Sequence, residues 1–322
     1  MPTCLRPARA IFALLFLLPL SATAASPCKV ADLMPAFWRA LASQAPAAEL
    51  RRTVVKPHPE LYNAVYVDLP SGEAWTRNVE RDVAYVGAHR AEVEAAAAYL
   101  RANVPAIMAG FGERFAGFRC DFTFYIAPTF GHMDGSAAYI DGQHRIVFAP
   151  DVIPRYHALA DLKLLIDHET FHVYHHQRTG VFGASPEAVP QTLNALWSEG
   201  LATYVSWRMN PQASLDTALL QPGIPQGAQP HLAAIAADLL AHLDQADETV
   251  FTHYFVAGRQ PPGYPPRAGY YVGVLVAQQL AKQYSLPQLA ALNGDALRAQ
   301  VATALRELAA PRRASEAAIV RP

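Results

Sequence analysis

The chain has few charged residues and no excess of either sign. Only 16% of its 322 residues are Asp, Glu, Lys or Arg, and the formal net charge at pH 7 is −1. Because such a chain presents no positive field to a polyanion, we expect no nucleic-acid partner. Hydrophobic residues make up 52%, which excludes an intrinsically disordered protein and is enough for a substantial core.

Long apolar runs are also missing beyond the N-terminus, so no membrane-spanning helix is expected in the mature protein. Residues 1–24 follow the pattern of a cleavable signal peptide. Arg6 and Arg9 precede an apolar segment over 10–20, and small residues at 22–24 provide a cleavage site. An apolar segment of this length is too short to cross about 30 Å of hydrocarbon. We therefore expect an exported protein, periplasmic or secreted.

Cysteine is scarce, with three in the whole chain. Cleavage of the signal would remove Cys4 and leave Cys28 and Cys120, neither of which has the spacing of a metal ligand. Two cysteines in an oxidising compartment favour one disulfide between them. The alternative is two free thiols.

The arrangement of apolar periods and turn residues predicts an α+β fold. Residues 25–118 are expected to form an N-terminal helical region, with one helix within 29–50 and a long Ala-rich helix over 78–117 that breaks near Pro105 and Gly110. A second region, 119–322, either follows as a separate domain or continues the first.

The second region begins with strands and continues with helices. Residues 120–130 alternate as a strand does, and Asp141-Gly142 between two further apolar segments predicts a hairpin. Helices are expected over about 156–179, 189–208 and 230–244, and two or three more over 268–309, separated by Pro/Gly-rich loops. This order predicts a small, mostly antiparallel sheet packed on an active-site helix, followed by a mostly helical C-terminal part.

The segment His168-Glu169-Thr170-Phe171-His172 matches the H-E-x-x-H pattern. Residues four apart in a helix project from one face, so the imidazoles of His168 and His172 can share one metal ion. Glu169 points about 100° away from His168, too far round to be an easy ligand but able to reach a water on the ion. This pattern is typical of two zinc ligands followed by a general base.

A catalytic zinc site needs a third protein ligand and one open position. The extended metzincin pattern does not continue here, because His175 and Arg178 stand where it requires Gly and His. The next helix contains Glu199 in "LWSEGLATYVS", followed by small residues that would allow it to approach the first helix. We therefore expect Glu199 to complete the site.

Together, "HETFH" and "WSEGLATY" resemble the motifs of gluzincin-type zinc metallopeptidases. "RAGYYVG" (267–273) further resembles a bacterial group known only as predicted zinc-dependent proteases. The resemblance covers roughly residues 120–305. It implies a zincin-like fold, Zn²⁺ held by His168, His172 and Glu199, and Glu169 as the general base. Where thermolysin-like enzymes have an Asp, this chain has Thr203, so the residues that support the ligands must differ.

Several other residues have two interpretations each. Tyr270 could donate its hydroxyl to an oxyanion or pack in the core. Asp134, in "GHMDG", could hold a substrate amine or belong to a turn. The edge of the strand over 145–149 could pair with an extended peptide. The sequence does not decide whether Asp167 supports a ligand, nor whether other residues near the motifs take part, namely His175, His176 and Tyr271.

The sequence thus predicts a zinc-dependent peptidase that acts on a peptide or protein substrate by a metal-activated water. Endopeptidase and aminopeptidase activity both remain open. The alternative is a catalytically silent, exported zinc-site protein that serves as a binding or assembly factor.

Overall fold

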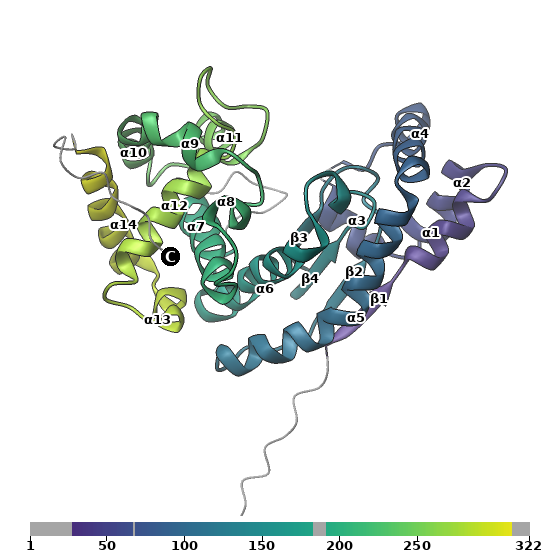
Figure 1. Ribbon diagram of the computed structural model, residues 1–322, viewed down its shortest axis with the longest axis horizontal. Coiled ribbons are helices and arrows are strands. Elements are labelled where there is room, and N and C mark those ends of the chain that lie inside the picture. The colour runs from purple at the N-terminus through teal and green to yellow at the C-terminus, as the bar shows by residue number, and fades with distance from the viewer. Residues whose placement is uncertain (1–27, 67, 183–190, 311–322) are drawn as a thin grey trace, which may run out of the picture.

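Two lobes meet along one long helix, α6 (Leu162–Thr179), as Figure 1 shows. The computed structural model describes residues 28–66, 68–182 and 191–310. The N-terminal lobe contains the sheet and helices α1 to α5, whereas the C-terminal lobe is helical. The expected signal peptide lies outside the described residues. In the part of the chain that is described, no helix combines the length and apolarity needed to span a bilayer.

The sheet has four strands in the order β1-β2-β4-β3, with bounds β1 (Lys29–Asp32), β2 (Thr123–Ile126), β3 (Gly135–Ile140) and β4 (Gln143–Phe148). The predicted hairpin is confirmed: β3 and β4 pair antiparallel around Asp141 and Gly142, whose φ angles are 52° and 74°. Positive φ at both residues is what a two-residue hairpin turn requires.

The expectation of a mostly antiparallel sheet is wrong, because β1 pairs parallel to β2 and β2 pairs parallel to β4. Parallel neighbours need long crossovers, and the helices of the N-terminal lobe form the one between β1 and β2. Residues 29–32, expected to begin a helix, form β1 instead. The edge strands of the described sheet are β1 and β3, and not the strand at 145–149, because β4 lies between β2 and β3.

Five helices accompany the sheet in the N-terminal lobe: α1 (Met34–Leu41), α2 (Pro46–Leu50), α3 (Pro59–Val65), α4 (Gly72–Ala88) and α5 (Arg90–Arg114). Short turns of π- or 3₁₀-helix lie at Arg51–Val55, Ile153–Arg155 and Leu159–Asp161. The expected break near Pro105 and Gly110 does not occur, since α5 continues through both. Pro105 lies on the exposed face, so solvent can satisfy the carbonyl of Arg101 that loses its helical partner.

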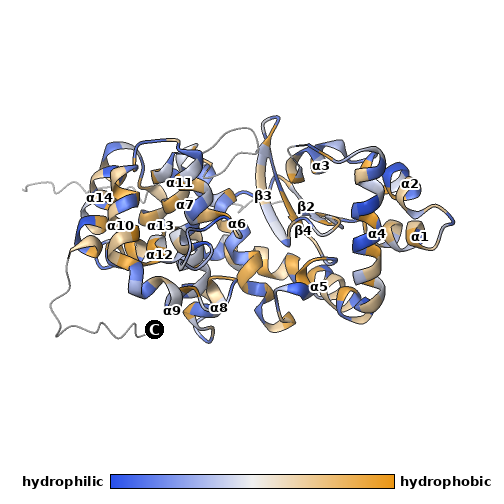
Figure 2. Ribbon diagram, turned by 90° about the horizontal axis from the view of Figure 1, so that it is seen from above, coloured by the Kyte–Doolittle hydropathy of each residue, from blue (hydrophilic) through white to orange (hydrophobic). Residues whose placement is uncertain are grey.

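The C-terminal lobe consists of helices α7 (Thr192–Met209), α8 (Leu215–Ala218), α9 (Ile224–Ala228), α10 (Leu232–Ala241), α11 (Glu248–Phe255), α12 (Ala268–Leu280), α13 (Leu286–Ala291) and α14 (Gly294–Ala309), with a 3₁₀ turn at Gln229–His231. The expected helices near 189–208, 230–244 and 268–309 are confirmed. Figure 2 shows apolar residues running along these helices, α10 among them. Short α9 lies where only a loop was expected.

Helix α6 is buried on both sides because each lobe packs its apolar core against it. Leu165, Ile166 and Val173 join the core of the sheet-containing lobe, whereas Phe171 and Tyr174 join the core of the helical lobe. Residues from both 25–118 and 119–322 contribute to the core of the sheet-containing lobe. The boundary between two domains that was expected at residue 118 stays a prediction. A helix buried all round is held rigidly, which suits the element that carries H-E-x-x-H.

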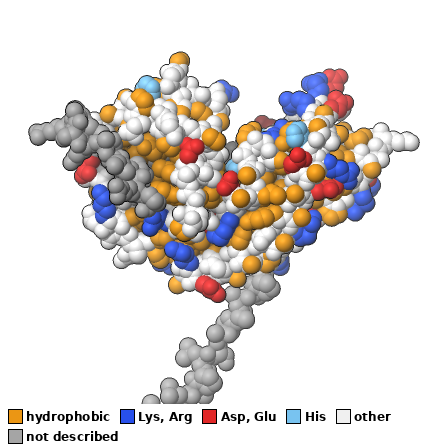
Figure 3. Space-filling model, in the orientation of Figure 1, with side chains coloured by type: hydrophobic (Ala, Val, Ile, Leu, Met, Phe, Trp, Pro, Cys, Tyr) orange, Lys and Arg blue, Asp and Glu red, His pale blue; other side chains and the backbone are white. Residues whose placement is uncertain are grey.

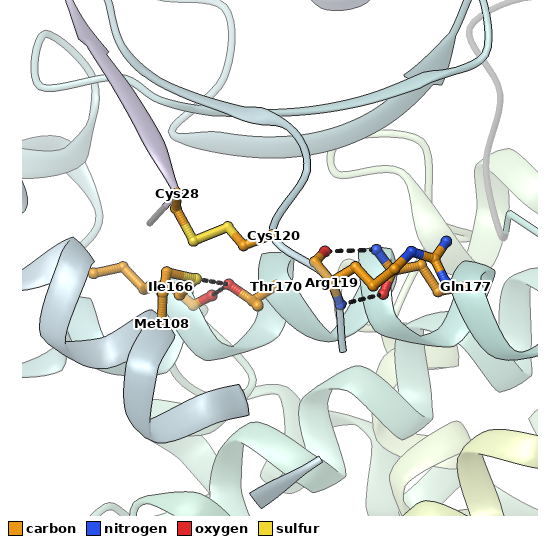
Figure 4. Close-up of a disulfide and its surroundings, with 7 residues drawn as sticks. All are labelled: Cys28, Met108, Arg119, Cys120, Ile166, Thr170 and Gln177. Atoms are coloured by element: carbon orange, nitrogen blue, oxygen red, sulfur yellow. Dashed lines mark hydrogen bonds between the residues drawn. A yellow bond between two sulfur atoms is a disulfide. The ribbon is translucent and has the colours of Figure 1, made fainter. Parts of the chain in front are cut away.

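The predicted disulfide between Cys28 and Cys120 is confirmed, with a Cα–Cα distance of 5.1 Å. It joins the chain just before β1 to the chain just before β2, as Figure 4 shows. The neighbouring Arg119 backbone donates to Oε1 of Gln177 on α6 (3.0 Å) and accepts from its Nε2 (2.7 Å). The disulfide thus fixes the chain at the point where the sheet is attached to α6. Such bonds persist in oxidising compartments.

Candidate metal centre

Two adjacent helices bring three possible metal ligands together. On α6, the Nε2 atoms of His168 and His172 lie 3.1 Å apart. Helix α7 packs beside α6 (Figure 1), and Oε2 of its Glu199 lies 3.4 Å from Nε2 of His168 and 3.5 Å from Nε2 of His172. These three side chains form a group that could hold a metal ion. The sequence predicted this group, including Glu199, 27 positions beyond His172.

The separations fit a tetrahedral site. Nitrogen and oxygen ligands bound about 2.0–2.1 Å from one zinc ion at tetrahedral angles lie about 3.3 Å apart. The three measured separations, 3.1, 3.4 and 3.5 Å, cluster around that value. Three protein ligands also leave a fourth position open, as a catalytic site requires.

His168 and Glu199 are in the charge states of metal ligands, whereas burial lowers the pKa of His172 but the charge of Glu199 outweighs it and raises that pKa above its usual value. Burial lowers the pKa of His168 to about 4, so its imidazole is neutral at physiological pH. Burial acts to raise the pKa of Glu199, but the adjacent imidazoles of His172 and His168 outweigh it and hold that pKa well below its usual value. A neutral imidazole and an ionised carboxylate are the forms that bind metal.

Glu169 lies beside the ligands without joining them. It lines the same cavity, of about 240 Å³, as the three ligands. Burial raises the pKa of its carboxyl to about 7, and the negative charges of Glu199 and Asp134 add to that effect. A carboxylate with a pKa near 7 can take up and release protons at neutral pH, as a general base must.

The cavity opens between the lobes. Its walls come from Gly135 to Ala137 on the edge strand β3, from α6, and from Arg267 and Tyr270 at the start of α12. Figure 3 shows a hollow between the two lobes on the face it presents. The free edge of β3 therefore borders the site.

Side-chain hydroxyls hold two of the candidate ligands in place, one through its ring and one through its backbone carbonyl. Oγ of Ser198 lies 3.1 Å from Nδ1 of His172, which orients that ring. Thr203 donates its hydroxyl to the backbone carbonyl of Glu199 at 2.8 Å. Nδ1 of His168 is buried without a hydrogen-bond partner among the described residues. Among the described residues, the hydrogen bonds that support the site thus go to the imidazole of His172 and to the backbone of α7 at Glu199, and none goes to Nδ1 of His168.

A tight helix crossing positions the start of α12 at the cavity. A Cβ built on Gly200 of α7 would lie 2.3 Å from the Cα of Gly273 in α12. We expected this glycine to let α7 approach α6, but its close contact is with α12. The crossing of α7 and α12 fixes the position of Tyr270 in the first turn of α12. The Tyr270 ring lies nearly parallel to the ring of His168 (centroids 6.5 Å apart, 17° between planes).

Tyr270 packs in the core and also lines the cavity. Its ring packs against the core of the helical lobe, as the packing interpretation requires. Burial, followed by the charge of Glu199, raises the pKa of its hydroxyl, so the group stays protonated. The hydroxyl is hydrogen-bonded to Glu199 and to Arg267, so it would have to turn from Glu199 to donate to a substrate. The oxyanion role remains open to it.

Asp134 lines the cavity, but its carboxylate is engaged. Oδ1 accepts from the backbone N–H of Gly135 at 2.9 Å, and Oδ2 lies 2.5 Å from Nε2 of His157. Asp167 points elsewhere, since its Oδ2 binds Lys163 (2.5 Å) and Asn210 (2.7 Å). It therefore ties α6 to the end of α7 and does not touch a ligand.

The remaining candidates near the motifs lie outside the cavity wall. His175 is buried and stacks on Phe171, and His176 bonds through Nδ1 to Nε2 of His144 at 2.8 Å. The hydroxyl of Tyr271 donates to Gln229 at 2.9 Å. Sequence reasoning gave no role to Ser198 or Arg267. Both lie within the quoted motifs, Ser198 in "WSEGLATY" and Arg267 at the start of "RAGYYVG", and that place was the only sign of a role.

Comparisons with protein-family models, with curated proteins and with solved structures found no match to this chain. Its function therefore has to be inferred from the side chains of the site and their geometry.

Proposed function

We propose that this protein is an exported, zinc-dependent peptidase of gluzincin type with a zincin-like fold. One observation carries the proposal: His168, His172 and Glu199 present three ligand atoms at tetrahedral separations, beside a buried carboxyl, Glu169, whose pKa is near 7. Metal binding alone has no use for that second carboxyl. Hydrolysis does, because an attacking water must give up a proton.

A bound zinc would supply Lewis acidity to the substrate carbonyl and lower the pKa of a water. The chain's own residues would do the rest. Glu169 would accept the proton of the attacking water and pass it to the leaving amine. Tyr270, protonated and facing the cavity, would donate to the oxygen that gains negative charge.

The edge of β3 is suited to hold the substrate. Gly135 to Ala137 line the cavity, and β3 has β4 on one side and no strand on the other within the described sheet. An extended peptide could therefore add to the sheet beside the metal. The Cys28–Cys120 disulfide supports export, since such bonds form outside the reducing cytosol.

Two substitutions separate the roles of the carboxyls. Glu199→Ala should lower zinc affinity by more than the roughly 10–100-fold that loss of a merely supporting partner costs. Glu169→Gln should bind about one zinc per chain, as wild type does, but should lose chelator-sensitive hydrolysis of a mixed peptide library. Metal content by mass spectrometry and competition with a chromophoric chelator measure the binding.

Unchanged zinc affinity in Glu199→Ala would remove the proposed third ligand. If wild type and Glu169→Gln each bind zinc and neither cleaves any peptide, the protein is a zinc-site binding or assembly factor instead. Metal content of the wild-type protein also tests whether the ion is zinc.

A further inference from the structure

Arg267 is the only Lys or Arg among the described residues that line the metal cavity. It precedes α12 with a φ of 56°, a left-handed conformation that residues other than glycine seldom adopt. Its guanidinium carbon lies 3.9 Å from the centre of the Tyr270 ring, which itself lies parallel to the ring of His168. The fold therefore holds a permanent cation in a fixed place close to the metal ligands.

The charge of Arg267 has no counter-ion within 4 Å among the residues that the structure describes. The ion pairs of the described residues do not include it, and its side-chain hydrogen bond goes to the Tyr270 hydroxyl. Two carboxylates influence it at longer range, Glu199 and Asp134. Both have other partners: Glu199 lies against the two imidazoles, and Asp134 is bonded to His157.

A guanidinium with free donors fits one kind of ligand especially well. Its planar array of N–H groups binds a carboxylate through two parallel hydrogen bonds. A divalent ion on the neighbouring ligands would add positive charge to the same cavity and further favour an anion. Asp134 is less suited to a substrate ammonium group, because each of its oxygens already has a partner, Gly135 or His157.

We propose that Arg267 binds the C-terminal carboxylate of the substrate, so that the enzyme releases residues from the C-terminal end of a peptide. The inference rests on the proposed function. In the reaction the water oxygen bonds to the carbonyl carbon, the C–N bond breaks, and the amine leaves with the proton that Glu169 took from water. A cavity of about 240 Å³ is smaller than most ligand pockets, which span about 300–1,000 Å³, and suits the end of a chain.

The test compares two peptides of one sequence, one with a free C-terminal carboxylate and one with a C-terminal amide. Binding to the zinc-loaded Glu169→Gln protein is measured by calorimetry, and the cleavage positions of the wild-type protein are mapped by mass spectrometry. The free acid should bind about 10–100-fold more tightly, as expected for a charge-assisted pair. Wild type should release short fragments from its C-terminal end.

Substitution of the arginine should abolish the discrimination. In the Glu169→Gln background, Arg267→Gln should bring the affinity ratio of the two peptides close to one, and Arg267→Lys should leave part of it. Arg298→Gln is the matched control, since Arg298 is exposed and pairs with Asp244 away from the cavity. It should keep the full ratio. Zinc content shows that each variant retains the site.

Two results would overturn the role of Arg267. One is equal affinity for both peptides with internal cleavage of both, which leaves the peptidase proposal standing. The other is an Arg267→Gln variant that weakens both peptides equally, which would mean that Arg267 only supports Tyr270. Absence of hydrolysis by the wild-type protein on all peptides would instead count against the proposed function, whatever the binding ratio.

Discussion

Replacing Gly200 by Ala should destabilise the protein, because α7 and α12 touch backbone to backbone at this residue. A Cβ on Gly200 would lie 2.3 Å from both the carbonyl carbon and the Cα of Gly273. A Cβ on Gly273 would lie 2.5 Å from the carbonyl oxygen of Leu196. Since the obstructing atoms belong to the backbone, no side chain can rotate away to make room.

The size of the effect follows from the displacement required. Favourable contacts between carbon atoms lie at about 3.5–4.0 Å, so the two helices would have to separate by about 1 Å or more. Overpacking a core typically costs about 1–3 kcal/mol. Because this contact is made only of backbone, we expect a cost at the upper end of that range, a loss of about 3 kcal/mol in the free energy of unfolding. The shift would also carry Arg267 and Tyr270 away from the cavity.

Urea denaturation of the variant and wild type measures the change in the free energy of unfolding. Gly110→Ala is the control, because Gly110 is exposed within α5 and a Cβ there would meet no atom within 4 Å. The same chemical change should stabilise the protein by about 0.5–1 kcal/mol at that site, since Ala restricts the unfolded chain. If Gly200→Ala were as stable as Gly110→Ala, the close helix crossing would be refuted.

Two further predictions concern the N-terminal lobe. Replacing Cys28 and Cys120 by Ser removes a crosslink between residues 92 positions apart and should cost about 4–5 kcal/mol by loop entropy. An unchanged urea midpoint in non-reducing buffer would contradict this. Asp82 is buried near Asp151 and Arg155, and burial, followed by the charge of Asp151, raises its pKa above the usual 3.8. The folded state therefore binds the proton more tightly, so this stabilisation is complete below about pH 4 and is lost as the pH rises through the raised pKa. Asp82→Asn has no group to titrate here and does not lose this stabilisation. The free energy of unfolding of the variant, minus that of wild type, should therefore rise between about pH 5 and 9 in urea titrations. A difference that stays constant with pH would show that Asp82 is ionised in the fold.

The sequence by itself determined the features that depend on residues close to one another along the chain. The helical period places His168 and His172 on one face wherever the helix packs. Asp141-Gly142 forms its hairpin because residues of these types tolerate positive φ. The motif around Glu199 predicted the third member of the group that could hold a metal ion.

Only the tertiary structure decided the features that join distant segments. The strand order was not predictable from the sequence. Helices α1 to α5 separate β1 from β2 along the chain, and the two strands become parallel neighbours only when these helices have packed. The partner of Gly200 proved to be α12, and the role of Arg267 became apparent once it was seen to share a cavity with the ligands. Short-range sterics and periodicity fix an element and the face it presents. Which faces meet depends on how all the apolar surfaces fit together, and no local pattern encodes that choice.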